Sequence, residues 1–200
     1  MTAPTVSLRG ASVAAGLASQ FVLGGSGAAW APGTEEHLSV HTSAGKYSTL
    51  GVAIHHARPE LADATLLFPD AAAADGAGYR DEFSLLAELQ FAFDIGAFVP
   101  TGTKLINLLP RIGFSAGAMF TDTHLDLPSF DGLIPYRARA AAPLFGFGIG
   151  LEARALRWLS LVPRLDALLT AGADENEISG GERFETEWRL SPGVDLVVWF

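Results

Sequence analysis

The chain has 200 residues, of which 49% are hydrophobic and 18% are charged, and its formal net charge is −9. The acidic balance argues against a nucleic-acid partner, and the lack of cysteine excludes disulfides and thiolate metal sites. No apolar run reaches the roughly eighteen residues of a membrane helix. The hydrophobic content therefore indicates either a large soluble core or a membrane barrel whose apolar side chains alternate with polar ones. The length suits a single domain over residues 1–200.

The first three predicted strands are residues 11–23, 36–43 and 46–55, in which apolar side chains recur at every second position. Such alternation is typical of a strand whose two faces meet different environments. The apolar positions before residue 10 fall in the opposite phase, which predicts a bulge near Gly10.

Four longer alternating segments follow, at residues 83–99, 105–120, 136–153 and 158–170. The third of these has glycines on its polar face, which would leave space in a crowded interior or let the sheet bend. These glycines are Gly146, Gly148 and Gly150.

Pro110, Pro163 and Pro192 lie inside predicted strands and share the apolar parity. A closed barrel has no free edge that would tolerate a missing N–H group. We therefore expect bulges at the prolines, and the alternative is that these strands are interrupted.

Residues 184–200 form the eighth predicted strand, with mostly apolar side chains at even positions and charged ones at many odd positions. The segment ends on Phe200, an aromatic residue of the apolar face. This arrangement resembles the closing strand of bacterial outer-membrane β-barrels, in which a terminal Phe is part of the assembly signal. Trp188 precedes Phe200 by twelve residues, which projects to roughly 30 Å along a membrane normal at typical strand rise and tilt. Trp158, Trp188 and Phe200 are the expected membrane-interface aromatics.

Acidic residues are concentrated in the predicted outer loops, whereas the charges within the predicted strands are nearly balanced. If residues 23–36, 58–82, 122–135 and 172–183 are outer loops, they contain fifteen of the 22 acidic residues. Most of the remaining acids and arginines share the inward parity of their strands and nearly balance. An eight-stranded interior is about wide enough for side chains to fill, so we expect a plug of ion pairs rather than a water-filled pore. The predicted network consists of Glu88, Asp94, Arg111, Arg164, Asp166, Glu187, Arg189 and Asp195.

Few residues in the sequence suggest a catalytic or metal-binding site. His37 and Ser39 share a strand face, and a His-x-Ser pair resembles the dyad of outer-membrane lipid A deacylases, in which Ser is the nucleophile and His the base. His37, His41 and His55 would also share an inward face, where ordinary hydrogen-bonded polar residues are the simpler interpretation. We therefore predict no enzyme activity, no catalytic residue, no cofactor and no metal site.

By pattern, the whole chain resembles the small OmpA/OmpX/OmpW-like barrels. The resemblance implies an all-β, eight-stranded antiparallel up-and-down transmembrane barrel in the outer membrane of a Gram-negative bacterium, with a signal peptide already removed. It implies a structural or surface-interaction role; the alternatives are a narrow channel for small hydrophobic solutes and a soluble lipocalin-like barrel. The expected partners are outer-membrane lipids, lipopolysaccharide and, through the C-terminal strand, the assembly machinery. We expect a monomer.

Overall fold

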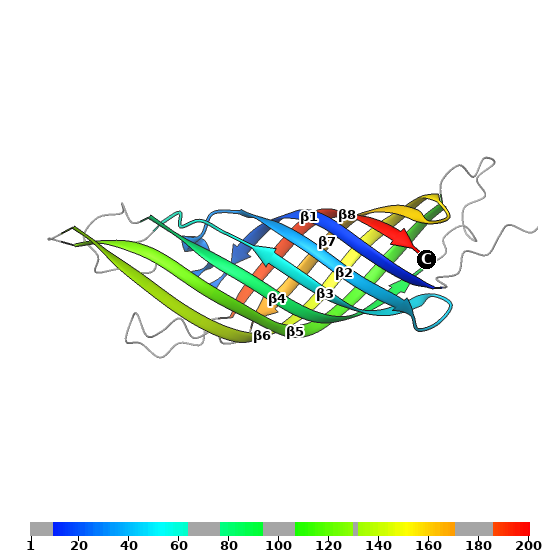
Figure 1. Ribbon diagram of the computed structural model, residues 1–200, viewed down its shortest axis with the longest axis horizontal. Helices are drawn as coiled ribbons and strands as arrows, with labels where there is room; N and C mark the ends of the chain where they lie inside the picture. Colours follow the sequence, from blue (N-terminus) through cyan, green and yellow to red (C-terminus); the bar gives the residue numbers. More distant parts are fainter. Residues whose placement is uncertain (1–9, 64–76, 94–106, 130–131, 171–185) are drawn as a thin grey trace, which may run out of the picture.

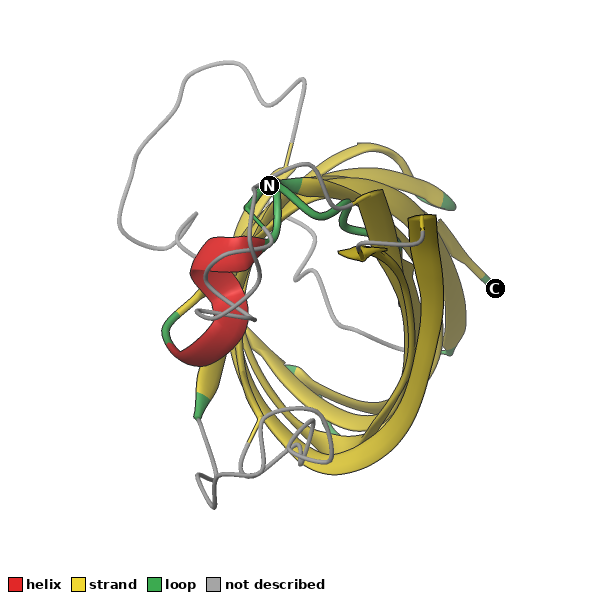
Figure 2. Ribbon diagram, turned by 90° about the vertical axis from the view of Figure 1, so that its left-hand side faces the viewer, coloured by secondary structure: helices red, strands yellow, loops and turns green. Residues whose placement is uncertain are grey.

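The computed structural model describes residues 10–63, 77–93, 107–129, 132–170 and 186–200. They form eight strands: β1 (Ala11–Leu23), β2 (Gly33–Ser43), β3 (Ser48–Ala57), β4 (Ala77–Ala92), β5 (Asn107–Ser129), β6 (Gly132–Leu156), β7 (Leu159–Thr170) and β8 (Glu187–Trp199). Each strand pairs antiparallel with the next, and β8 closes on β1 (Figures 1 and 2). The prediction of an eight-stranded antiparallel barrel is confirmed.

One short 3-10 helix, η1 (Gly25–Ala29), connects β1 to β2. No helix within the described ranges is long and apolar enough to cross a membrane.

The two ends of the barrel differ. At one end, here called the turn end, lie Phe200 and the tight connections between β2 and β3 and between β6 and β7. At the other, called the loop end, lie η1 and the tip of the β5–β6 hairpin, where Ser129 pairs with Gly132. Because β5 and β6 have 23 and 25 residues, they extend beyond the other strands at the loop end (Figure 1).

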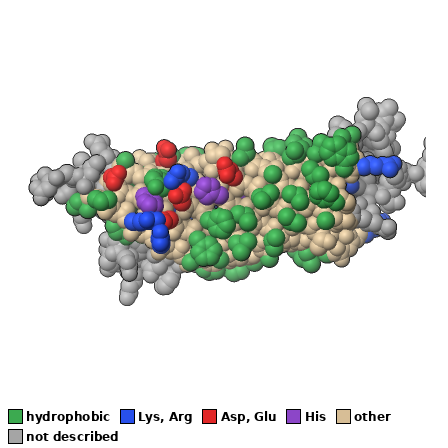
Figure 3. All heavy atoms as spheres, in the orientation of Figure 1, with side chains coloured by type: hydrophobic (Ala, Val, Ile, Leu, Met, Phe, Trp, Pro, Cys, Tyr) green, Lys and Arg blue, Asp and Glu red, His purple; other side chains and the backbone are tan. Residues whose placement is uncertain are grey.

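Alternation along each strand separates an apolar outer face from a polar interior. The outer face is a continuous apolar belt, visible in Figure 3 as the hydrophobic part of the surface. Its larger side chains are Leu17, Phe21, Leu38, Val40, Leu50, Val52, Ile54, Phe83, Leu85, Phe114, Phe120, Phe145, Phe147, Ile149, Leu161, Leu165, Val194 and Leu196, all between 38% and 61% exposed. Burying such a belt in lipid removes the cost of exposing it to water. A soluble lipocalin-like barrel needs the reverse arrangement.

Several strands start earlier or end later than the alternation predicts. β2 begins at Gly33, β4 at Ala77 and β6 at Gly132, and β5 continues to Ser129. Parts of the predicted outer loops are therefore strand. Beyond the apolar belt the outward positions become polar, so alternation of hydrophobicity disappears although the strand continues. The predicted bulge near Gly10 involves residues outside the described ranges, and Gly10 itself has a positive φ of 108°.

The predicted bulges at the three prolines are wrong. Pro110 pairs with Leu151 in an unbroken register. Pairing is interrupted beside Pro163 between β6 and β7, and beside Pro192 between β8 and β1, and in both places it resumes in the same register. A proline loses one N–H but keeps its carbonyl, and that of Pro110 accepts a hydrogen bond of 2.9 Å from the Phe93 N–H. The barrel thus tolerates each proline at the loss of one ladder bond.

Candidate functional site

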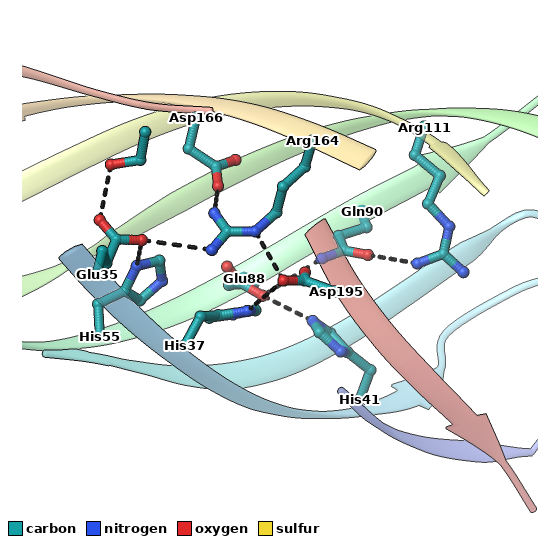
Figure 4. A network of polar contacts seen from close by, with 11 residues as sticks. Glu35, His37, His41, His55, Glu88, Gln90, Arg111, Arg164, Asp166 and Asp195 are labelled. Carbon is teal, nitrogen blue, oxygen red and sulfur yellow. Dashed lines mark hydrogen bonds and ion pairs between the residues drawn. The ribbon is translucent and has the colours of Figure 1, made fainter. Parts of the chain in front are cut away.

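The described residues of the interior form three groups of ion pairs, one of which surrounds Arg164 on β7 (Figure 4). The Arg164 Nε donates to Asp195 Oδ1 at 2.9 Å, and its Nη2 donates to Glu35 Oε1 at 3.3 Å. Arg164 also forms an ion pair with Asp166. The Ser191 hydroxyl donates to the second oxygen of Glu35 at 2.7 Å. This central cluster ties β2, β7 and β8 together across the lumen.

The loop-end cluster is centred on Arg189 of β8, which is 1% exposed. Its guanidinium donates to both oxygens of Glu82 at 2.9 and 3.1 Å, to Glu187 at 2.9 Å and to the Thr170 hydroxyl at 2.9 Å. Arg80 contacts Glu82 as well, at 2.7 Å. Two guanidinium groups thus face two carboxylates, which offsets much of the desolvation cost of each charge.

The turn-end cluster surrounds Glu152 of β6, which is fully buried. Arg111 donates to one of its oxygens at 2.7 Å, and Arg154 donates to the other at 2.9 Å. The indole N–H of Trp199 donates to Glu152 at 3.0 Å, and both guanidinium groups lie over the Trp199 ring, at 5.4 and 4.8 Å. The penultimate Trp of the chain therefore packs inside the barrel and stabilises this cluster through cation–π contacts.

The structure brings most of the predicted network residues into these clusters. Arg164, Asp166 and Asp195 lie in the central cluster, Glu187 and Arg189 at the loop end, and Arg111 at the turn end. Glu88 lies beside the central cluster and accepts a hydrogen bond of 2.7 Å from His41 Nε2. Asp94 lies outside the described residues.

Sequence reasoning missed several members of the network: Glu35, Arg80, Glu82, Glu152, Arg154 and Trp199. The first three were assigned to outer loops and Arg154 to a turn, although the structure places all four in strands. Their inward parity is continuous with that of the neighbouring strand residues. Extending the parity of β2, β4 and β6 past the last outward apolar side chain would have identified them.

Inward glycines give these side chains room. A Cβ on Gly16 would lie 1.9 Å from Asp195 Oδ1, and one on Gly148 would lie 2.2 Å from Asp166 Oδ1. A Cβ on Gly51 would lie 2.2 Å from the His41 ring, which reaches past β3 toward Glu88 on β4. An internal cavity of about 60 Å³ remains, lined in part by Gly113, Gly148 and Gly150, which is room for only a few water molecules.

The His-x-Ser pair does not form a dyad. His37 Nδ1 lies 3.2 Å from Asp195 Oδ1, and the buried Ser39 hydroxyl has no hydrogen-bond partner in the described part of the chain. A nucleophile and its base need to be within hydrogen-bonding reach. The deacylase hypothesis therefore gains no support from the geometry.

Charged side chains on the outer face gather at the loop end, just beyond the apolar belt (Figure 3). This outer charged arc consists of Glu36, His56, Arg58, Asp81, Asp122, His124, Arg137 and Arg139. Arg137 and Arg139 both bind Asp122. The hydrogen bond from Arg137 holds the pKa of the Asp122 carboxyl well below its usual range and raises the pKa of Arg137 itself. The Asp122 carboxylate and the Arg137 guanidinium therefore stay ionised over the ordinary pH range.

The three predicted interface aromatics lie on the outer surface near the two ends. Trp158 occupies the β6–β7 turn and is 54% exposed, whereas Trp188 lies near the start of β8, toward the loop end, and is 47% exposed. Phe200 lies at the turn end, where its N–H donates to the Ala11 carbonyl at 2.9 Å.

No family model and no curated protein matches the sequence. Among solved structures, the chain is similar to neisserial surface protein A, with 16% identity and a TM-score of 0.57 over 95% of this chain and 97% of that one. It is also similar to Ail, the attachment invasion locus protein of Yersinia pestis, in complex with the heparin analogue sucrose octasulfate, with 12% identity and a TM-score of 0.50 over 94% and 99%. The chain therefore has the fold of the small eight-stranded outer-membrane β-barrels.

Proposed function

We propose that this protein is an integral outer-membrane barrel with a plugged lumen and a structural or surface-contact role. The observation that carries the proposal is the combination of an outward apolar belt with a lumen crossed by three ion-pair clusters. The loop end is then extracellular and the turn end periplasmic, and Trp158, Trp188 and Phe200 lie where interface aromatics are expected.

A plug is favoured over an open channel by the small size of the cavity between the described interior residues. The internal cavity of about 60 Å³ is bordered by Arg111, Arg164 and Asp195, whose side chains are held by several partners each. All eight strand pairs keep their register except beside the β6–β7 turn. Both features disfavour the alternative of a narrow channel with a lateral opening for hydrophobic solutes.

Planar-bilayer conductance tests the plug. We expect no sustained unit conductance from the wild-type protein, because ion pairs fill the lumen. The triple variant with Glu35, Arg164 and Asp195 all changed to Ser removes one guanidinium and two carboxylates together, and we expect it to open discrete conducting events. The matched control is Arg139→Ser, which removes an outward arginine. Regular single-channel events in the wild type would instead favour the channel.

A surface role is supported by the loop end. β5 and β6 extend past the belt, and an open groove of about 670 Å³ is lined there by residues that include Tyr79, His124, Tyr136 and Arg137. Grooves that combine aromatic and charged side chains are common at binding surfaces. The Ail structure contains a sulfated heparin analogue. By analogy, we include a polyanionic partner among the proposed surface contacts of this chain.

Anionic lipid headgroups are the proposed partners of the outer charged arc. Arg137 and Arg139 share the single carboxylate of Asp122 and are 53% and 70% exposed, so their remaining N–H groups face outward above the belt. Arginine binds phosphate groups through paired N–H donors, and a basic residue near an anionic membrane surface contributes about 1 kcal/mol.

The double variant Arg137→Gln/Arg139→Gln tests this lipid contact. We expect lipopolysaccharide, added to protein in micelles, to raise the thermal midpoint of the folded band of the wild type more than zwitterionic phosphatidylcholine does. The double variant should lose most of this difference. Arg157→Gln, at the turn end, is the control and should keep it. An equal response of wild type and double variant would contradict the contact.

A further inference from the structure

Two buried histidines of the central region face each other across adjacent strands. His37 on β2 pairs with His55 on β3, and their ring centroids are 4.6 Å apart. Their side chains are only 5% and 6% exposed. In both rings Nδ1 lies against a carboxylate, 3.2 Å from Asp195 in His37 and 2.9 Å from Glu35 in His55. Figure 4 shows both rings with these carboxylates beside them.

The second nitrogen of each ring has no such partner. Nε2 of His37 and Nε2 of His55 are buried without a hydrogen bond to any described residue. An ionised carboxylate can only accept, so each Nδ1 carries a proton, and in the neutral imidazole each Nε2 then presents a lone pair. A buried polar atom without a partner is costly. Two such nitrogens on rings that face each other form a position that a bound cation could satisfy.

A third possible ligand lies close to both rings. One ring nitrogen of each histidine and one carboxylate oxygen of Glu88 on β4 all lie within 4.8 Å of one another. Glu88 is oriented from the other side by His41, whose Nε2 donates to Oε2 at 2.7 Å, and by Gln90 at 3.3 Å. The three side chains come from three consecutive strands, so the barrel wall holds their relative positions.

We propose that His37, His55 and Glu88 bind one divalent transition-metal ion inside the lumen, and that Zn²⁺ fits best. Two imidazoles and one carboxylate are a common zinc set, with Zn–N distances of about 2.0–2.1 Å that put tetrahedral donors about 3.4 Å apart. The observed spacing of up to 4.8 Å would have to close to that value when the metal binds. Glu88 also helps to line the cavity of about 60 Å³ described above, which gives water access to this carboxylate.

The surroundings have the features of a supported metal site. Asp195 and Glu35 hold the Nδ1–H groups as the outer carboxylates of metal-binding histidines usually do. The local charge is compatible with a cation: the carboxylates Glu35, Glu88, Asp166 and Asp195 lie in the described part of this region with the guanidinium of Arg164 and, along the same cavity, that of Arg111. Imidazole ligands select Zn²⁺, Ni²⁺ or Cu²⁺ rather than Mg²⁺ or Ca²⁺, which prefer oxygen. Bound metal would join β2, β3 and β4 inside the plug.

Calorimetric titration of ZnCl₂ into tag-free protein refolded in detergent micelles tests the proposal. We expect one Zn²⁺ per barrel and no binding of Mg²⁺ under the same conditions. His55→Gln removes a ligand, and loss of an outer partner alone usually costs roughly 10–100-fold in affinity, so the loss here should be at least that large. The matched control is His56→Gln, the next residue, whose side chain points outward and is 48% exposed. It should bind Zn²⁺ as the wild type does.

Two further measurements keep the test decisive. The heat-dependent gel shift establishes that each variant is folded, and His37→Gln replaces His55→Gln if the latter fails to fold. Co²⁺ added to the wild type should give the visible absorption of a tetrahedral site. Wild-type protein that does not bind Zn²⁺, or an equal loss of binding in the His55 and His56 variants, would overturn the proposal and leave the two Nε2 atoms to water.

Discussion

Replacing Arg189 with Met is expected to lower the free energy of unfolding by about 3–5 kcal/mol, the usual cost of removing one partner from a buried charged group. Arg189 is 1% exposed and donates to Glu82, Glu187 and Thr170. Methionine fills a similar volume but leaves the carboxylates with fewer donors in a region that water does not reach. Urea unfolding in lipid vesicles, followed by the heat-dependent gel shift, measures the loss.

Two further variants show whether the loss of stability in Arg189→Met comes from the buried charges or from a nonspecific effect of replacing an arginine. Arg139→Met removes an outward arginine that is 70% exposed and whose partner Asp122 keeps Arg137, so its cost should stay below about 1 kcal/mol. The double variant Arg189→Met/Glu82→Gln removes the guanidinium and a charge that it neutralises, and should recover part of the stability. Equal losses from Arg189→Met and Arg139→Met would show that the loop-end cluster contributes little to stability.

Period-two alternation predicted the number of strands because it reflects the two environments of a barrel wall. Wherever the outer face carries Leu, Phe or Val against a polar inner face, as in residues 145–151 and 188–198, the strand was predicted within a few residues. At the loop end the outer face carries Glu36, Asp81 and Asp122 instead. With polar side chains on both faces, the hydrophobic signal of a strand disappears, and the loop-end parts of β2, β4, β5 and β6 were not predicted as strand.

Parity assigned charged residues such as Arg164 and Asp195 to inward faces, but it gave no information on which inward charges meet. Arg164 binds Glu35 across 129 residues of sequence, and Ser191 binds the same carboxylate across 156. Such partners depend on the stagger of neighbouring strands, which determines the height of each side chain in the lumen. Alternation shows which face of a strand a side chain occupies, but it carries no information on the height of that side chain in the lumen. The prediction of bulges at the prolines was wrong for a related reason. The register of a strand is set by all of its pairs together, so one missing N–H group does not shift it.

The histidines illustrate the same limit. Sequence parity puts His37, His41 and His55 on one face, and the interpretation of ordinary hydrogen-bonded polar residues followed from that alone. The structure adds that carboxylates from β2 and β8 hold the two Nδ1 atoms and that both Nε2 atoms lack partners. Neither fact is visible in a single strand. The metal hypothesis therefore depends on the closure of β8 onto β1, which brings Asp195 to His37.

Replacing Phe147 with Arg is expected to destabilise the barrel in lipid by about 2–4 kcal/mol, the cost of a charged side chain near the bilayer midplane. Phe147 lies on the outer face of β6 between Phe145 and Ile149, is 44% exposed, and its ring contacts that of Phe114 edge to face at 5.7 Å. The measurement is the free energy of unfolding in vesicles, from urea titration. The effect arises from the surrounding lipid, because the side chain does not enter the ion-pair clusters.

Ile134→Arg provides the matched control on the same strand. Ile134 is equally apolar and 56% exposed, but it lies on the extension of β6 beyond the belt, where it pairs with Leu127. Near or outside the interface the same change should cost about 0–1 kcal/mol. A large difference between the two variants that disappears as the host lipid is shortened would locate the membrane around residue 147. Equal costs at both positions, or folding of the wild type in buffer without lipid or detergent, would contradict a membrane-spanning belt and favour the soluble barrel.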